Sequence, residues 1–160
     1  MYWLGWEWAK LGYCLRSGGA DGSDTAFEKG YKDNKGPYPA IYLPWKGFNK
    51  RASPYHEPSE EAFELALQFH PKPDLLRTRT SIWALMARNA HQVLGLNLDR
   101  RADLIVCYCR YTKHPDGTKT YEGGTGQALR MADFYEIPVL NLYDEYGDHD
   151  DLLRLARTIP

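Results

Sequence analysis

The chain has 160 residues, which is the usual size of one domain and enough to bury a substantial core. Apolar residues make up 43% of the sequence and charged residues 26%, and both values are ordinary for a globular protein. The formal net charge of −1 argues against tight binding to long nucleic acid, which normally requires a basic surface.

Three cysteines, Cys14, Cys107 and Cys109, all lie in apolar, strand-like stretches. Their odd number and apolar surroundings predict buried, reduced thiols in a cytoplasmic protein. Cys107 and Cys109 are separated by one residue, unlike the two-residue spacer of a zinc knuckle, so we expect no metal site. No apolar run approaches the roughly 18 residues of a membrane helix, and the first residues lack a signal-peptide pattern, so no membrane contact is expected.

The apolar spacing predicts helices and strands that alternate along the chain. In order, we expect a helix over residues 1–11, a strand over 13–15, a helix ending near 30, a strand over 40–43, helices over 59–69 and 81–94, a strand over 104–109, a helix from 123, a strand over 137–142 and a helix near 149–157. This alternation predicts an α/β fold with a Rossmann-like, doubly wound and mostly parallel sheet that has helices on both faces. Residues 1–160 are expected to form a single domain.

Two glycine-rich turns each stand between a strand and a helix, RSGGADGSD at 16–24 and GGTGQ at 123–127. Glycines let a ligand approach the backbone N–H groups, and the start of a helix is positive, so both turns suit an anion, above all a phosphate. One such turn can be no more than a tight connection, but two of them favour phosphate binding. Neither contains the Gly-Lys-Ser/Thr of a Walker motif, so ATP hydrolysis is not expected.

Polar side chains near these turns have two interpretations each. Ser23 or Asp24 can cap the following helix, or Asp24 could hold the ribose hydroxyls of a nucleotide. Trp45, Lys46 and Asn49 follow the strand over 40–43, where they could stack on a base and read its edge, or pin a hydrophobic loop to the body.

Asn89, next to Arg88, lies on the apolar side of the helix over 81–94. An unpaired buried amide costs about 1–3 kcal/mol, so Asn89 needs a partner, either a structural backbone group or a ligand.

The segment 110–122 is rich in basic side chains and is interpreted either as a lid over an anionic ligand or as a solvated loop. These side chains are Arg110, Lys113, His114 and Lys119.

In parallel sheets, ligands bind at the carboxyl ends of the strands. The loops 17–24, 44–49 and 110–126 all leave predicted strand ends, so we expect them to converge. The residues expected to contact the ligand are Arg16, Ser17, Gly18, Gly19, Gly22, Ser23, Asp24, Trp45, Lys46, Asn49, Arg88, Asn89, Gly123, Gly124, Thr125, Gly126 and Gln127.

Four segments, taken together and in order, resemble the small DprA-like, Rossmann-type proteins of bacteriophage genomes. They are LRSGGADGSDTAFEKG, YLPWKGFN, RNAHQVLG and YEGGTGQALRMADFYEIPVLNL. These proteins belong to the wider superfamily of DprA and lysine-decarboxylase-like (SLOG) domains, and the resemblance covers about residues 8–145. It implies a sheet that binds a nucleotide or a nucleotide-derived molecule, such as an ADP-ribose-type signal, with no resident cofactor. For a phage-encoded protein, it implies the host cytoplasm and a role against host defence.

Two departures from the family pattern matter. Family members begin with a strand and a Gly-Ser-Arg-type turn, whereas this chain begins at the helix over 1–11. Either another segment fills the gap, or the sequence starts at an internal methionine, or a missing central strand exposes unpaired backbone and favours a homo-oligomer. The phosphoribohydrolase relatives carry a Gly-Gly-x-Gly-Thr-x-x-Glu motif with a catalytic Glu, and Arg130 stands at that position here.

The sequence therefore leaves three hypotheses for the function. The favoured one is retention of a nucleotide or ADP-ribose-like molecule without catalysis. The second is hydrolysis of an N-glycosidic bond with Asp24 or Glu28 as the acid, against which Arg130 argues. The third is a single-strand DNA-binding recombination accessory of the DprA type, against which the near-neutral charge argues.

Overall fold

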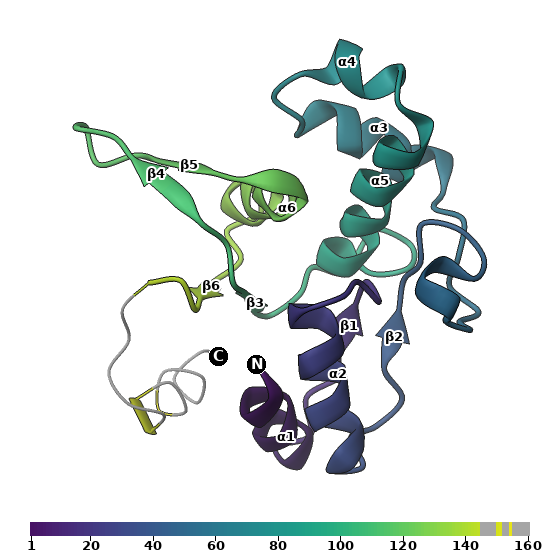
Figure 1. Ribbon diagram of the computed structural model, residues 1–160, viewed down its shortest axis with the longest axis vertical. Coiled ribbons are helices and arrows are strands. Elements are labelled where there is room, and N and C mark those ends of the chain that lie inside the picture. Colours follow the sequence, from purple (N-terminus) through teal and green to yellow (C-terminus); the bar gives the residue numbers. More distant parts are fainter. Residues whose placement is uncertain (145–149, 152–153, 155–160) are drawn as a thin grey trace.

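The computed structural model describes residues 1–144, 150–151 and 154, and its fold is α/β (Figure 1). The helix expected near 149–157 lies largely outside these residues. The described helices are α1 (Tyr2–Lys10), α2 (Ser23–Asp33), α3 (Glu60–Gln68), α4 (Pro73–Arg77), α5 (Thr80–Leu94) and α6 (Gly123–Phe134), with a 3₁₀ turn η1 at Phe48–Lys50. All except α4 and η1 were expected from the apolar spacing.

The helix ends follow from local chemistry. Ser59 Oγ accepts a hydrogen bond from Ala62 N at 3.3 Å and so caps the start of α3. Gly95 ends α5 with a φ of 82°, a backbone conformation that glycine adopts without strain. Pro73 stands at the first position of α4, where its missing N–H costs nothing.

The strands form three separate pairs in the described part of the chain. Strand β1 (Arg16–Ser17) pairs in parallel with β2 (Ala40–Ile41), and β3 (Ile105–Cys107) pairs in parallel with β6 (Val139–Asn141). Strands β4 (Tyr111–Lys113) and β5 (Lys119–Tyr121) form an antiparallel hairpin. The α/β class and the parallel pairing agree with the sequence analysis, but one continuous doubly wound sheet is not present among the described residues.

The backbone directions show where the sheet is interrupted. The carbonyl oxygens of Leu15 and Ser17 accept hydrogen bonds from the β2 side, both at 2.8 Å, so the N–H and C=O of Arg16 point away from β2. Ile105 N donates to Pro138 O at 2.9 Å, so the N–H and C=O of Val106 point away from β6. Each parallel pair therefore has an inner edge without a ladder partner in the described residues.

Apolar side chains beside β1 and in β3 and β6 pack on the same two helices, α1 and α2. Leu4, Trp8, Phe27 and Leu140 form a buried cluster, and Leu15, Leu104 and Val106 are among the partly buried residues that pack on it.

Helices α1 and α2 cross at two glycines. A Cβ at Gly5 would overlap the carbonyl oxygen of Phe27, and a Cβ at Gly30 would overlap that of Tyr2. The two helix backbones are therefore in direct contact.

A larger core lies between α3, α5 and α6. Its fully buried side chains include the small ones of Ala62, Ala66, Ala87 and Ala90, together with Met131. Figure 1 shows α3 and α4 at one end of the molecule and α5 running from that end toward the middle.

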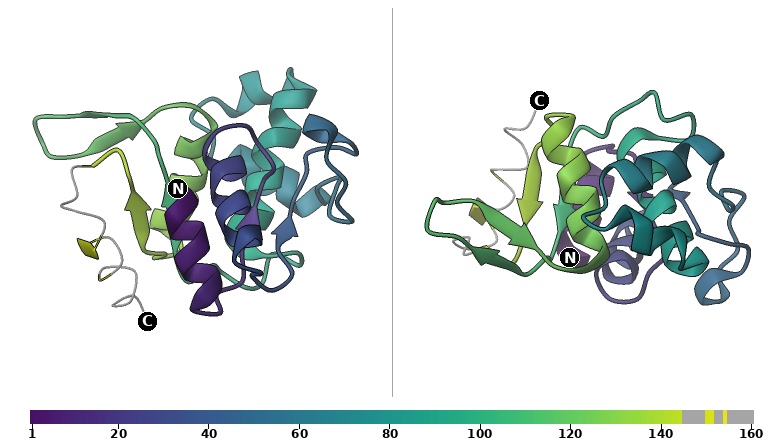
Figure 2. Two further views of the ribbon diagram at one scale, coloured as in Figure 1. Left: turned by 60° about the horizontal axis from the view of Figure 1, so that its bottom comes forward. Right: turned by 90° about the horizontal axis from the view of Figure 1, so that it is seen from above.

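The hairpin β4–β5 projects from the body on the side away from β1 and β2 (Figures 1 and 2). Lys119 Nζ lies 3.2 Å from Asp144 Oδ1 and 4.1 Å from the centre of the Tyr111 ring. The segment 110–122 is therefore solvated, as one of its two interpretations expects, but it forms a hairpin and not a loop. It is not a lid over the turn at 17–24, because it extends away from that turn.

The cysteines are only partly as expected. Cys107 and Cys109 are buried, but Cys14 is exposed, because it precedes the short strand β1 rather than lying inside it. Burial, with a smaller contribution from Cys109, raises the pKa of the Cys107 thiol to about 12, so this side chain stays protonated. No group of three or more His, Cys, Asp or Glu side chains is arranged to hold a metal within the described ranges. Among those same residues, no helix is both long and apolar enough to cross a membrane.

His91 joins α5 to the start of α3. Its Nε2 accepts a hydrogen bond from Ser59 N at 3.3 Å, and its Nδ1 lies 3.2 Å from Gly95 O, so the ring is neutral with its proton on Nδ1. The ring is 5% exposed and stacks on Tyr42 at 5.6 Å. Burial lowers the pKa of His91 below its ordinary value of 6.5.

We expect the free energy of unfolding to fall as the pH drops below about 6.5, because His91 then becomes protonated in the unfolded chain but stays neutral in the native protein. Above that pH both states are neutral at this residue and it adds no pH dependence. Urea unfolding between pH 7.5 and 5.5 measures the effect, and His91→Gln, which does not titrate, should flatten the profile. An unchanged profile in the glutamine variant would contradict this role.

Candidate functional site

The turn between β1 and α2 folds around the carboxylate of Asp24, the second residue of α2. Asp24 Oδ2 accepts hydrogen bonds from Gly18 N at 3.2 Å and Ala20 N at 3.1 Å. Helix α2 starts at Ser23 after Gly22, and no side chain caps it. The predicted capping role of Ser23 or Asp24 is therefore wrong, because Asp24 binds the turn's amides and not those of the helix.

Arg88 of α5 lies directly beneath this turn. Its side chain is 8% exposed, and its Nη1 lies 3.6 Å from Asp24 Oδ2. Neither Nε nor Nη1 has a hydrogen-bond partner among the described residues. Burial lowers the pKa of the guanidinium, while Asp24 and Glu28 oppose this shift. The turn thus covers a buried cation whose hydrogen-bonding capacity is largely unused.

A second ion pair closes the other side of the turn. Glu28 Oε1 accepts a hydrogen bond from Ser17 Oγ at 2.5 Å, and Glu28 Oε2 pairs with Arg51 Nη1. Arg51 Nη2 also donates to Thr25 Oγ1 at 2.9 Å. The side chain of Arg51 covers Gly19, since a Cβ there would lie 2.9 Å from Arg51 Cδ.

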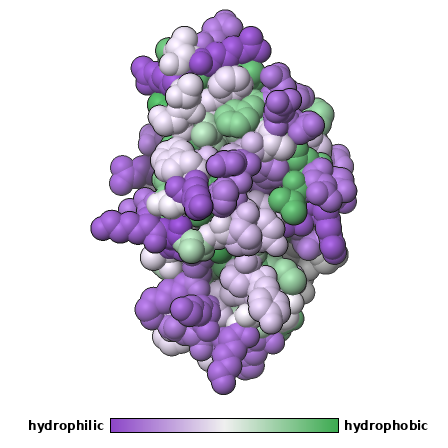
Figure 3. All heavy atoms as spheres, turned by 90° about the vertical axis from the view of Figure 1, so that its right-hand side faces the viewer, coloured by the Kyte–Doolittle hydropathy of each residue, from purple (hydrophilic) through white to green (hydrophobic). Residues whose placement is uncertain are grey.

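The loop after β2 reaches the same turn. Asn49 Nδ2 donates to Gly19 O at 3.0 Å, so the expected convergence of the loops 17–24 and 44–49 is confirmed. Lys46 is exposed, and Trp45 is 39% exposed, with its ring edge-to-face against Phe48 at 5.2 Å. Figure 3 looks onto this side of the molecule and shows a mostly hydrophilic surface with scattered apolar spots.

The second glycine-rich turn opens α6 and is tied to α5 by amide side chains. Asn89 Nδ2 donates to Gly124 O at 3.2 Å and to Gln127 Oε1 at 3.0 Å. Gln127 is fully buried and also donates to Met131 Sδ at 3.2 Å. The structural interpretation of Asn89 is therefore confirmed, and Gln127 is occupied in the same way.

The start of α6 remains uncapped by any side chain. Its N-cap residue Glu122 makes no side-chain hydrogen bond to the helix, and Thr125 is exposed in the first turn. Gly123 has a φ of 63°, which glycine adopts without strain, and Gly126 N closes the first helical turn on Glu122 O at 3.3 Å. A Cβ at Gly126 would lie 2.8 Å from Tyr121 O, so this glycine lets β5 pass close to α6.

Both turns are anchored on consecutive residues of one helix. Arg88 lies against the first turn and Asn89 against the second, so the two turns flank the same part of α5. The loop 110–126 meets this region only through its last residues, because the hairpin that precedes them extends away (Figure 1).

The side chains of Arg16 and Arg130 point away from the turns, toward backbone carbonyl groups elsewhere. Arg16 Nη1 donates to Arg100 O at 2.7 Å and Val93 O at 3.4 Å, where it satisfies carbonyl groups near the end of α5. Arg130 Nε donates to Phe69 O at 2.7 Å, at the end of α3.

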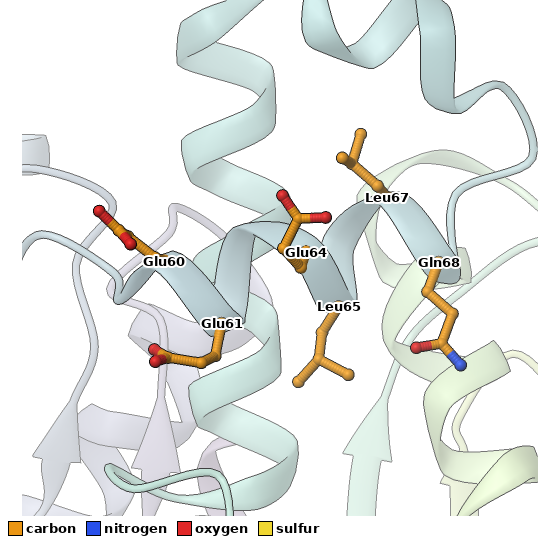
Figure 4. A pocket seen from close by; sticks show the side chains of 6 residues that line it. All are labelled: Glu60, Glu61, Glu64, Leu65, Leu67 and Gln68. Carbon is orange, nitrogen blue, oxygen red and sulfur yellow. The ribbon is translucent and has the colours of Figure 1, made fainter.

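A hollow along α3 is lined by Glu60, Glu61, Glu64, Leu65, Leu67 and Gln68 (Figure 4). It contains none of the turn residues, and its three carboxylates repel an anion, so it is not a candidate phosphate site.

Sequence reasoning missed Arg51 and gave Glu28 only a catalytic role. The spacing of Asp24 and Glu28, four residues apart on one helix face, was a usable signal that both carboxylates face one site. Arg51 has no such signal, because its partner is far away along the chain.

Comparisons with family models, with curated proteins and with solved structures find no match to this chain. The site must therefore be interpreted from its own geometry.

We expect Gly18→Ala to destabilise the protein by about 1–3 kcal/mol, because the added Cβ would overlap the guanidinium of Arg88. The φ of Gly18 is outside the left-handed region, so the cost arises from lack of space and not from the backbone. Chemical unfolding measures it. In an Arg88→Ala background the same alanine should cost much less, and an equal cost in both backgrounds would refute the contact.

Proposed function

We propose that this domain binds a nucleotide or a nucleotide-derived small molecule, such as an ADP-ribose-type signal, with a phosphate group at the turn 18–23. The observation that carries the proposal is the Arg88 guanidinium, which is buried under Gly18 with two nitrogen groups that lack a partner in the described chain. A buried cation of this kind is strongly stabilised by an oxyanion, which arginine can bind through two parallel hydrogen bonds.

The start of α2 adds to the attraction. No side chain caps this helix, so its first N–H groups and its positive end remain available to a negatively charged group. The uncapped start of α6 supports a second contact with an elongated ligand, since both turns are fixed on α5. Two phosphates, or a phosphate and a ribose, suit such an arrangement.

Retention is better supported than hydrolysis. The carboxylates of Asp24 and Glu28 are both held by hydrogen bonds and ion pairs, and Arg130 occupies the motif position of the catalytic acid and is bonded to Phe69. A DNA-binding role has less support, because the 21 acidic residues slightly outnumber the 20 basic ones.

Titration calorimetry against AMP, ADP, NAD, ADP-ribose and cyclic ADP-ribose tests the proposal. We expect at least one of them to bind, and Arg88→Gln to weaken that binding at least tenfold, about 1.4 kcal/mol, because the buried charge is lost. Arg110→Gln removes an equal charge from an exposed position and is the matched control. The proposal would be rejected if none of these compounds binds, or if the Arg88 variant binds its ligand as tightly as the wild type does.

A further inference from the structure

The carboxylate of Asp24 occupies the position that an anionic ligand would take in the first turn. Its Oδ2 accepts from two backbone amides, Gly18 N and Ala20 N, at 3.2 and 3.1 Å. The same oxygen lies 3.6 Å from Arg88 Nη1. Two amides and a guanidinium around one oxygen are the donors that recognise a phosphate oxygen in other proteins.

The fit between Asp24 and these donors is incomplete. Arg88 Nη1 is close enough to attract the carboxylate but makes no hydrogen bond to it, and Nε has no partner among the described residues either. A carboxylate on a short side chain offers two oxygens, whereas a phosphate monoester offers three and carries more charge. A phosphate group can therefore satisfy donors that Asp24 leaves unpaired.

The carboxylate of Asp24 can also leave this position. Its side chain is 27% exposed, so it can rotate toward solvent without crossing the core, whereas the Arg88 side chain beneath it is 8% exposed. The carboxylate that leaves is rehydrated, and the incoming anion keeps Arg88 neutralised.

We propose that Asp24 is a built-in competitor for the phosphate group, which must displace this carboxylate from Gly18, Ala20 and Arg88 in order to bind. This inference deepens the proposed function and rests on its phosphate site at the same turn. Its ligand class is a terminal phosphate, either free or as a monoester, since a bridging diester phosphate presents fewer unshared oxygens to the three donors.

The competition makes a quantitative prediction about charge. Four ionised side chains lie at the turn, and their charges sum to zero. They are Asp24, Glu28, Arg51 and Arg88. Asp24→Asn keeps an oxygen that can accept from the two amides but leaves the group with one positive charge. We expect the affinity for inorganic phosphate and for AMP, measured by titration calorimetry, to rise roughly tenfold or more in this variant.

Asp21→Asn is the matched control, because Asp21 is an exposed carboxylate of the same turn and does not touch these donors. It should change the affinity less than about threefold at physiological salt. Asp24→Asn combined with Arg88→Gln should abolish the gain. Unchanged or weaker phosphate binding by a folded Asp24→Asn variant would overturn the inference and make Asp24 a purely structural residue.

If Asp24→Asn does not fold, the wild-type protein gives the answer by amide NMR. The resonances of Gly18 and Ala20 should shift when AMP is added, because their acceptor changes, and binding that leaves both unmoved would overturn the inference. The two proposals fail separately. If the wild type binds no nucleotide while Asp24→Asn binds inorganic phosphate, only the proposed function is rejected. If the wild type binds a nucleotide and Asp24→Asn binds it more weakly, only the competition is rejected.

Discussion

A buried guanidinium pressed against a glycine is the constraint on which the rest of this site depends. The Arg88 side chain has almost no exposure to water. Its guanidinium lies where a Cβ at position 18 would be, so only glycine fits there without moving it. A charge in such a place needs compensation, which explains why Asp24 folds back onto the turn. The shape of the first turn is thus a consequence of one cation on a neighbouring helix.

Helix α5 carries this constraint to the rest of the molecule. Within one turn of the helix, Arg88 contacts the first glycine-rich turn, Asn89 binds the second and His91 reaches the start of α3. Because a helix is stiff over so short a distance, the two uncapped helix starts keep a fixed relation to each other. The polar residues on the buried side of α5 therefore organise the site, although the apolar pattern marks that side as core.

The sequence predicts the parts of this structure that depend on neighbours along the chain. The end of α5 at Gly95 follows from local conformation, and the convergence of two loops follows from the general geometry of parallel strands. Strand extent was less predictable, because the apolar run 104–109 pairs over only three residues and pairing depends on distant partners. Asp24 was expected at the site, but its binding of Gly18 looks the same in sequence as a helix cap. Arg51 could not be found, since nothing local marks an ion pair between this loop residue and Glu28 of α2.

The divided sheet has a thermal consequence. Inner strands of a parallel sheet normally share a ladder of hydrogen bonds. Among the described residues, the two parallel pairs are instead connected through the apolar cluster around Trp8 and Leu140, on which Leu15, just before β1, and Val106 of β3 both pack. Attraction between apolar groups weakens on cooling, whereas a backbone ladder does not depend on it. The contact between the two strand pairs should therefore weaken on cooling before either pair separates.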